Sequence, residues 1–408
     1  MPWKATSVMQ ARLRFVADYL SAQEPMTVLC ERYGISRQTG YKWMRRFAED
    51  GARGLEERSR APHHHGRATA AELVVELIEA RQRKPYWGPK KLLAMLGRQY
   101  PDWPWPAPST VADMLRREGL SAPRRRRRRA LTVEQPFAAV NAANDAWCID
   151  FKGWFRTGDG TRCDPLTVSD AHSRYLLGLE IIEPVTSAVE KITDRLFGEY
   201  GLPARIRSDN GPPFASSGAG GLTRLSARWA KMGIGLERIY PGKPQQNGRH
   251  ERMHGTLKAQ TCDPPARTAA EQQRWFDAFR QEYNFERPHE ALGQTPPAQL
   301  YSASARAFCT RLEDPDYGPH EQVRRVRTSG EVRWRGGLIF ISEALIGQAI
   351  GISERQDGHW LVRFADVPLA LIDRYTGKLT RFGPGRPPKP QSRPHPNPAK
   401  TVSDVAGQ

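Results

Sequence analysis

Cysteine is scarce in this sequence, and its spacing excludes two classes of protein. The 408 residues include five cysteines, and no two of them form a CxxC pair: Cys30, Cys148, Cys163, Cys262 and Cys309. Disulfide-rich secreted domains and structural zinc sites depend on closely spaced cysteines. The pattern therefore predicts a protein of a reducing compartment without a zinc site.

Long apolar runs are also lacking. The most apolar late stretch, residues 336–352, contains Glu343 and Gln348, and the first residues lack the apolar core of a signal peptide. A membrane-spanning helix needs about 20 predominantly apolar residues. We therefore expect a soluble, cytoplasmic protein with no membrane partner.

Acidic residues are in the minority. Lys and Arg total 62 against 44 Asp and Glu, a formal net charge of +18. Such an excess favours polyanionic partners. Six arginines follow one another without interruption: Arg124, Arg125, Arg126, Arg127, Arg128 and Arg129. This run cannot pack in a core and indicates a solvated linker or a phosphate-binding arm. A protein that is basic by composition alone is the alternative, and the run argues against it.

The first part of the chain predicts a helix-turn-helix module. Residues 9–22 and 26–33 have helical apolar spacing, and Ser36 can cap a third helix that extends to about Glu49. Its exposed face would present four side chains to a major groove: Arg37, Gln38, Lys42 and Arg45. The alternative is a plain three-helix bundle with a solvated basic face. Gly40 weakens the prediction, because glycine within a helix costs about 1 kcal/mol relative to alanine.

A second helix-turn-helix module is expected in residues 70–117. Residues 70–83 are amphipathic, the Tyr-Trp-Gly-Pro segment at 86–89 opens another helix, and Ser109 can cap a short third helix. On that helix Arg116 and Arg117 would face outward. The histidines at 63–65 lie between the two modules. They indicate a flexible linker, because no Cys or His follows at metal-ligand spacing.

Later segments predict an α/β domain and then a small β domain. Strands are expected over 146–155, 165–171, 174–182 and 204–208, with a helix over 187–200, which is the order of an RNase H-like sheet. Beyond 330, short apolar or alternating runs separated by turn residues predict a small β-barrel. The proposed boundaries are helix-turn-helix domain 1–60, second helix-turn-helix domain 61–123, Arg-rich linker 124–139, α/β RNase H-like catalytic core 140–300, linker 301–330, C-terminal β-barrel 331–384 and disordered basic tail 385–408.

Three acids occupy settings that isolated carboxylates rarely have. Asp150 ends an apolar, strand-like run, Asp209 follows the strand expected over 204–208, and Glu251 lies in a helical stretch entered through Gly242 and Pro244. Mg²⁺ prefers carboxylate oxygens, and two such ions can hold the attacking and leaving oxygens of a phosphoryl transfer. Carboxylates from distant chain positions are therefore typical of a metal-dependent enzyme that cuts and joins DNA.

Five motifs that occur in order resemble those of DDE transposases and retroviral integrases, and bacterial insertion-sequence transposases above all. They are Trp-Cys-Ile-Asp-Phe-Lys at 147–152, Val-Ser-Asp-Ala-His-Ser-Arg-Tyr at 168–175, Ser-Asp-Asn-Gly at 208–211, Pro-Gly-Lys-Pro-Gln-Gln-Asn-Gly-Arg-His-Glu-Arg at 241–252, and Tyr-Asn-Phe-Glu-Arg-Pro-His-Glu-Ala-Leu-Gly-Gln-Thr-Pro at 283–296. The resemblance implies that Asp150, Asp209 and Glu251 are the catalytic acids and hold two Mg²⁺ or Mn²⁺ ions. It also implies a transposase that binds element ends and target DNA in the bacterial nucleoid, as a homo-oligomer.

The resemblance extends to DNA contacts around these acids. Lys152, Asn247, Arg249 and Lys258 are the expected contacts near the catalytic site, and Gly255 stands where retroviral integrases place a lysine one turn past the catalytic Glu. The spacing from Asp209 to Glu251 is longer than the retroviral one, and the Gly-rich segment 216–221 can hold the extra residues.

Other acids and other functions remain open. Asp145 is expected at the entrance of a strand, Asp170 in a structural role, and Glu237 within a strand and outside the metal site. One alternative function is a DNA-binding regulator with an inactive core. A second is a metal-dependent nuclease that cuts without joining.

Overall fold

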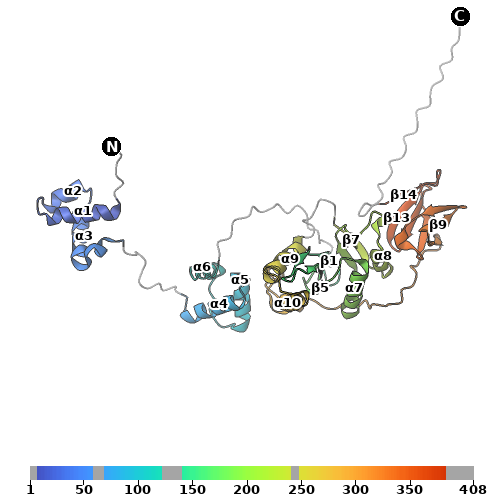
Figure 1. Cartoon of the computed structure of the whole chain (residues 1–408), viewed down its shortest axis with the longest axis horizontal. Coiled ribbons are helices and arrows are strands. Elements are labelled where there is room, and N and C mark those ends of the chain that lie inside the picture. The colour runs from blue at the N-terminus through green and yellow to red at the C-terminus, as the bar shows by residue number, and fades with distance from the viewer. Residues whose placement is uncertain (1–6, 58–68, 122–139, 240–247, 383–408) are drawn as a thin grey trace, which may run out of the picture. The chain divides into compact units, whose positions relative to one another are not determined.

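A computed structural model describes residues 7–57, 69–121, 140–239 and 248–382 (Figure 1). The chain divides into two compact units, residues 1–70 and 71–408, and each is described by itself. Across these described ranges, no helix is both long enough and apolar enough to cross a membrane.

The first unit is a small helical module. Its elements are α1 (Val8–Leu20), α2 (Met26–Arg32), α3 (Arg37–Asp50) and a 3-10 turn η1 (Gly51–Leu55). Ser7 closes a capping box with Gln10 at the start of α1, and the Ser36 hydroxyl accepts the Thr39 N–H at the start of α3. The cap that we predict at Ser36 is therefore confirmed.

Gly40 is required by the packing of this module. It is buried in α3, and a Cβ at this position would lie 2.7 Å from Cys30 Sγ and 3.0 Å from both Met26 Sδ and Phe15 Cζ. Any side chain here would push α3 away from α1 and α2. Glycine lowers the intrinsic stability of α3, but close packing of the three helices requires a residue without a side chain at this position.

The second unit begins with another three-helix module, α4 (Ala71–Arg83), α5 (Pro89–Gln99) and α6 (Pro108–Arg117). Its core is a cluster of buried apolar side chains: Leu77, Ala80, Trp87, Leu92, Leu96, Val111 and Leu115. Gly88 precedes α5 and Pro89 is its first residue, as we predict. The predicted cap of α6 is wrong, because Ala107 is the N-cap and Ser109 lies inside the first turn. Pro108 with its fixed φ begins the helix two residues earlier than a cap at Ser109 would.

The α/β core is built on a five-stranded mixed sheet in the order β5-β4-β1-β6-β7. Its strands are β1 (Trp147–Phe151), β4 (Pro165–Asp170), β5 (Leu176–Ile181), β6 (Arg205–Ser208) and β7 (Gly235–Arg238). β1, β4 and β5 pair antiparallel, whereas β6 and β7 continue the sheet parallel to β1. The predicted order of three strands, a helix and a strand is present.

One predicted strand is shorter in the structure. The run expected over 146–155 ends at Phe151, because Gly153 adopts a φ of +90° that turns the chain out of the sheet. Phe155 then pairs with Cys163 in a separate two-stranded ribbon of β2 (Phe155–Arg156) and β3 (Arg162–Cys163).

Helices cover both faces of this sheet. One face packs on α7 (Thr186–Tyr200) and α8 (Arg224–Lys231) through a cluster that includes Trp147, Ile149 and Ile206. The other packs on α9 (Gly248–Thr261) and α10 (Ala269–Gln281) through Leu176 and Leu179 (Figure 1). Short turns follow α10: a π-turn η4 (Glu282–Glu286), η5 (Glu290–Leu292) and η6 (Pro297–Gln299).

The C-terminal domain is all β. Its elements are β8 (Gln322–Arg325), β9 (Glu331–Trp334), β10 (Gly337–Phe340), η7 (Glu343–Leu345), β11 (Ala349–Glu354), β12 (Trp360–Phe364), β13 (Val367–Ile372) and β14 (Leu379–Arg381). Five strands form an antiparallel sheet in the order β14-β13-β12-β11-β8, and β9 and β10 form a separate ribbon. Within the described residues β14 and β8 remain the edges, so the closed barrel that we predict is not formed. β8 lies in the segment expected as a linker.

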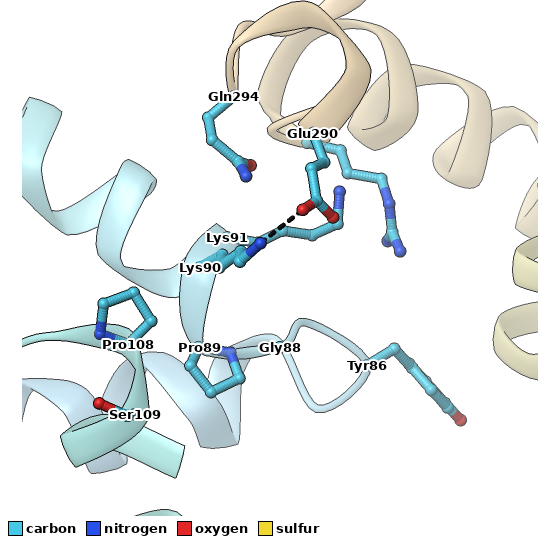
Figure 2. Close-up of a pocket in the computed structure, with 10 residues that line it drawn as sticks. Tyr86, Gly88, Pro89, Lys90, Lys91, Pro108, Ser109, Glu290 and Gln294 are labelled. Carbon is cyan, nitrogen blue, oxygen red and sulfur yellow. Dashed lines mark hydrogen bonds and ion pairs between the residues drawn. The ribbon is translucent and has the colours of Figure 1, made fainter. Parts of the chain in front are cut away.

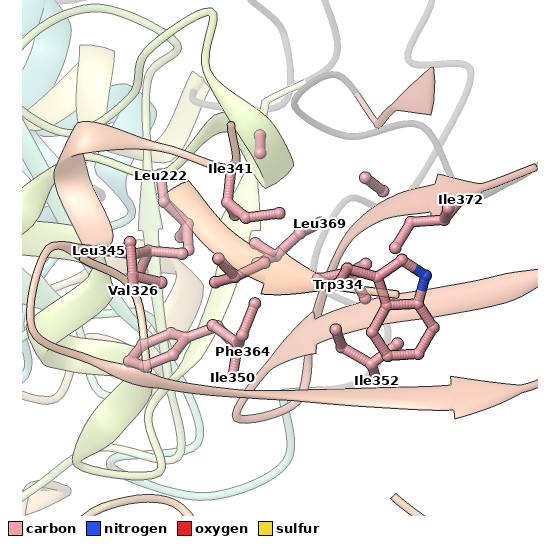
Figure 3. Close-up of a cluster of buried hydrophobic side chains, with 14 of the residues drawn as sticks. Leu222, Val326, Trp334, Ile341, Leu345, Ile350, Ile352, Phe364, Leu369 and Ile372 are labelled. Carbon is pink, nitrogen blue, oxygen red and sulfur yellow. The ribbon is translucent and has the colours of Figure 1, made fainter. Parts of the chain in front are cut away.

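The C-terminal sheet packs on the core through a junction that we call the apolar junction. Ala219, Leu222, Ala227 and Ala230 of the core belong to one buried cluster with side chains of the β domain, among them Leu345 and Leu369 (Figure 3). The Gly-rich segment expected to hold extra length contains the turn η2 (Ala219–Gly221), which forms part of this surface. Gly220 has a φ of +63°, and a Cβ there would lie 2.9 Å from Leu369 Cδ2.

The module α4–α6 contacts the core through a different kind of surface, which we call the polar junction. Lys84 Nζ lies 3.2 Å from Glu282 Oε2 and 2.6 Å from Glu286 Oε2. Trp87 Nε1 donates to Glu282 Oε1 at 3.0 Å, and Lys91 donates to the Pro288 carbonyl. Charged and polar groups therefore provide the contacts at this surface.

Candidate active site at the ends of strands β1 and β6

The register of two neighbouring strands brings Asp150 and Asp209 to one edge of the sheet. β1 and β6 run parallel, with Trp147 opposite Ile206 and Cys148 opposite Arg207. The same register carried to the strand ends places Asp150 opposite Asp209. Carboxyl ends of parallel strands meet at the same edge, which is where open α/β sheets place their binding sites. Two acids that are far apart in sequence thus become neighbours.

Alternation along the strands assigns both acids to the face that α9 covers. Trp147, Ile149 and Ile206 pack in the cluster with α7 and α8. Successive side chains of a strand point to opposite faces. Asp150 and Asp209 therefore belong to the other face, on which α9 packs.

The Ser-Asp-Asn-Gly turn fixes the Asp209 carboxylate. Asn210 Nδ2 donates to the Ile239 carbonyl at 2.6 Å and so ties the end of β6 to the end of β7. Gly211 N–H donates to Asp209 Oδ1 at 3.2 Å, and a Cβ on Gly211 would lie only 3.2 Å from Oδ2. Burial raises the pKa of Asp209, while the Gly211 N–H and the charge of Arg238 act in the opposite direction. A desolvated carboxylate of this kind favours a cationic ligand.

Glu251 lies in the first turn of α9, and its side chain is exposed. An acid in the first turn of a helix is stabilised by the helix dipole. On the side of α9 that faces the sheet, His250 is only 3% exposed, and Met253 and Leu257 are also buried. The helix therefore packs on the sheet through one side and leaves Glu251 accessible at its start.

Two histidines anchor α9 beside Asp150. Thr167 stands opposite Asp150 in the register of β1 and β4, and its Oγ1 donates to the Asp150 carbonyl at 3.0 Å. The same Oγ1 lies 2.6 Å from His250 Nε2 and 2.8 Å from His254 Nε2. Because a hydroxyl has a single proton, both Nε2 atoms must then donate to Thr167. This network ties the helix that carries Glu251 to the strand neighbouring Asp150.

Both imidazoles are held neutral. Burial, together with the charge that His254 would carry, lowers the pKa of His250 well below its usual value. Burial, and next the charge of Lys152, lowers the pKa of His254 to about 4. One ligand atom from each of Asp150, His250 and His254 lies within 4.8 Å of the other two, a spacing that could hold a metal ion through ring nitrogens that carry no proton. Among the described residues this is the group that the structure brings together, and it includes neither Asp209 nor Glu251.

The rival acids are engaged elsewhere. Asp170 is 1% exposed and accepts hydrogen bonds from the backbone N–H groups of Asn144, His172 and Ser173 and from the Ser173 hydroxyl. Asp145 accepts two backbone N–H groups at the entrance to β1. Glu237 pairs with Arg205 and Arg207 across β6 and β7. These partners give each acid a structural role.

The predicted DNA contacts fall into four groups. Those on the helices α3, α6 and α9 are exposed: Arg37, Gln38, Lys42, Arg45, Arg116, Arg117 and Lys258. Lys152 is half-buried, with Nζ 5.1 Å from the centre of the Phe155 ring. Those outside the described residues are the six arginines 124–129 and Asn247. Arg249 is part of α9, but its side chain is not described.

Sequence reasoning does not identify His250 and Thr167 as residues of the site. The two histidines at positions i and i+4 of a helix are a visible signal, because residues four apart share one face. The site residues that we predict from the sequence include neither His250 nor His254. The role of Thr167 depends on its register with Asp150, which local sequence does not reveal.

Family models match both the helical and the α/β parts of the chain. Models described as "Integrase core domain" match residues 140–244 and 232–297. Models described as "Helix-turn-helix domain" and "Homeodomain-like domain" match residues 11–63 and 39–115. These matches agree with the helical modules and the α/β core described above.

Insertion-element proteins are similar along most of their length. A protein of insertion element IS407 from Burkholderia multivorans is 30% identical over 250 residues, which is 60% of this chain and 84% of the relative. A protein of insertion element IS476 from Xanthomonas euvesicatoria is 28% identical over 232 residues, 56% of this chain and 64% of the relative. The catalytic core domain of HTLV-2 integrase in complex with magnesium aligns with a TM-score of 0.31 and 16% identity, over 39% of this chain and 97% of that one. The two family matches to the core and the extent of the IS407 similarity show that the chain belongs to the integrase-core family of insertion-element proteins and is a DDE-type transposase.

Proposed function

We propose that Asp150, Asp209 and Glu251 hold two divalent ions, Mg²⁺ or Mn²⁺, and that the chain uses this site to cleave DNA at the ends of its element and to join the freed ends to target DNA. The observation that carries this proposal is the parallel register of β1 and β6, which sets Asp150 and Asp209 side by side. The three side chains suit such ions, since carboxylate oxygens are the ligands that hard cations prefer. When bound, such ions activate a water or a 3′-hydroxyl and stabilise the leaving oxygen.

The residues of the chain hold this arrangement in place. Asp150 and Asp209 stand on strands of one sheet and are fixed relative to each other. Glu251 is held through the contacts of His250 and His254 with Thr167, which tie the first turns of α9 to the sheet. Preorganised positions of this kind are what a site for in-line displacement requires.

The other parts of the chain suit the recognition of duplex DNA. The exposed polar face of α3 and the outward Arg116 and Arg117 of α6 are positioned on helix-turn-helix modules. We propose that α3 enters a major groove and that Arg116 and Arg117 contact DNA near the element end. Two ends must be paired for joining, so we propose that the chain acts as a homo-oligomer on bacterial DNA.

The test uses labelled duplexes that carry the DNA flanking this gene. Wild-type protein and Glu251→Gln are incubated with these duplexes and Mg²⁺ or Mn²⁺. The control is Glu199→Gln, an equivalent change of an exposed acid on α7, which pairs with Arg195 and faces away from the site. We expect metal-dependent cleavage and joining in wild type and in the control, and neither in Glu251→Gln.

Two outcomes would contradict the proposal. Specific binding without strand chemistry in either metal would indicate a DNA-binding regulator with an inactive core. Sequence-independent cleavage that never joins would indicate a nuclease.

A further inference from the structure

We propose that a pocket at the polar junction binds a phosphate, and that its natural ligand is a backbone phosphate of the element-end DNA. This inference rests on the proposed function for the identity of the DNA. The pocket measures about 470 Å³ and is lined by the first turns of α5 and α6 and by the segment after α10 (Figure 2). None of its residues takes part in the site of Asp150, Asp209 and Glu251.

The strongest observation is a buried cation without a hydrogen-bond partner at one end of its guanidinium. Arg287 lines the pocket and is 6% exposed. Its Nη1 has no hydrogen-bond partner, and Glu282 Oε1, the carboxylate oxygen that pairs with it, is 4.0 Å away. That oxygen already accepts from Trp87 Nε1. A buried guanidinium with a free N–H is costly unless an anion satisfies it.

The remaining charges of the pocket also favour an anion. Lys90, Lys91 and Arg287 oppose a single acid, Glu290. Lys90 Nζ lies 2.5 Å from Glu290 Oε1, and Figure 2 shows this pair at the pocket. This pair is at the rim, because both side chains are largely exposed. Burial, and then the charge of Arg287, lowers the pKa of Lys91 to about 8. Lys91 and Arg287 therefore repel each other in the protein alone, and a bound anion would remove that repulsion.

The N-termini of two helices add positive partial charge to the pocket. α5 begins at Pro89 and α6 at Pro108, neither has an acidic residue in its first turn, and neither N-cap makes a side-chain hydrogen bond. Pro89, Pro108 and Ser109 line the pocket. Helix N-termini carry a partial positive charge and favour phosphate groups.

The position of the pocket indicates why DNA is the source of the phosphate. One wall belongs to a helix-turn-helix module, whose exposed Arg116 and Arg117 lie on the same helix α6, and the other wall belongs to the catalytic core. A backbone phosphate held there would contact both parts at once. Binding of the element end would then strengthen the docking of the module on the core and couple recognition to strand chemistry.

The experiment compares three variants of the full chain. Lys91→Met removes a pocket cation while it keeps the length of the side chain. Lys84→Met removes a cation of the same junction that does not line the pocket and is the matched control. Ser109→Asp places a carboxylate at the start of α6, where it is favourable for the helix but occupies the anion site. Because Ser109→Asp is expected to keep or raise the melting temperature, it separates loss of binding from loss of folding.

The first arm uses inorganic phosphate at an ionic strength matched with chloride. We expect phosphate to raise the melting temperature of wild type and of Lys84→Met, and to have little effect on Lys91→Met and Ser109→Asp. No difference between phosphate and chloride in wild type would overturn the proposal.

The second arm uses element-end duplexes in which one phosphate at a time is replaced by a neutral methylphosphonate. We expect the replacement at one position to weaken DNA binding by the wild-type protein several-fold and to leave DNA binding by Lys91→Met unchanged. The affinity of Lys91→Met for unmodified DNA should also depend less on salt, by about one phosphate contact. Stabilisation by free phosphate without any such position would overturn DNA as the source. Equal weakening of Lys91→Met and Lys84→Met at every position would show a structural contact only. Binding data decide this arm, so a wild-type protein that binds but does not cleave would contradict the proposed chemistry and not the phosphate site.

Discussion

The two junctions of the catalytic core are built from opposite kinds of contact. The apolar junction buries Leu222 of the core with Leu345 and Leu369 of the C-terminal domain. The polar junction holds α4–α6 through Lys84 and Trp87 on Glu282 and Glu286. Apolar burial is not screened by salt, whereas contacts between partly exposed charges are. We infer that the C-terminal domain is a permanent part of the core and that the second helical module docks reversibly.

The largest effect is expected at the apolar junction. Leu222→Ala removes a fully buried side chain and should lower the free energy of unfolding by about 2–5 kcal/mol. Leu338→Ala, the same change at a half-exposed position of β10, should cost less than about 0.5 kcal/mol. Urea unfolding of both variants provides the measurement. Equal losses would show that Leu222 is not part of a packed interface.

A smaller and salt-dependent effect is expected at the polar junction. Glu282→Gln weakens the pairing with Lys84 and leaves the Trp87 contact, so docking should weaken by about 1–3 kcal/mol. Hydrogen exchange of α5 should accelerate in the variant, and in wild type when salt rises from about 0.05 to 0.5 M. Exchange of β13 should not change.

Lys231→Met, which removes an ion pair with Asp314 near the apolar junction, is the control and should cost no more than about 1 kcal/mol of stability. Salt-independent exchange of α5 would remove the distinction between the junctions.

The segment after α10 that borders the polar junction should also be sensitive to acid, because His289 lies between Pro288 and Glu290, which contact Lys91 and Lys90. Burial, and then the charges of Lys91, Arg174, Arg287 and Arg252, lowers the pKa of His289 to about 4. The unfolded chain has the ordinary histidine value of about 6.5 and binds a proton first. This contribution to stability is therefore complete above pH 6.5 and declines as pH falls towards 4.

The pH dependence can be isolated with a matched pair of variants. Between pH 6.5 and 5, His289 should account for about 1 to 2 kcal/mol of the decline in wild type. His289→Gln should show a shallower decline, and a change of the exposed His320 to Gln should leave the slope as it is. Parallel curves for all three proteins would show that His289 is not held neutral.

The sequence predicts those features that depend on local pattern. Ser36 at the start of α3, the pair Gly88 and Pro89 at the start of α5, and the strands that lead to Asp150 and Asp209 are all visible as caps, prolines and apolar runs. The approach of Asp150 to Asp209 also follows, once parallel neighbours are assumed.

Features that depend on contacts between distant segments could not be predicted. Gly40 weakens the sequence argument until its neighbours Cys30 and Met26 are known. The Gly-rich segment around Gly220 suggests only spare length, yet it packs against β13 because a side chain there would collide with Leu369. Thr167 becomes part of the site only through its register with Asp150. Packing and register, rather than local propensity, determine these roles.

In the proposed function, the paired acids at the strand ends hold the metal ions. Strand transfer by Asp209→Cys tests it most directly, because a thiolate is a poor ligand for Mg²⁺ and accepts softer cations better. We predict a loss of at least about a hundredfold with Mg²⁺ and partial recovery with Mn²⁺. Strand transfer with Mg²⁺ at the wild-type rate would contradict the account.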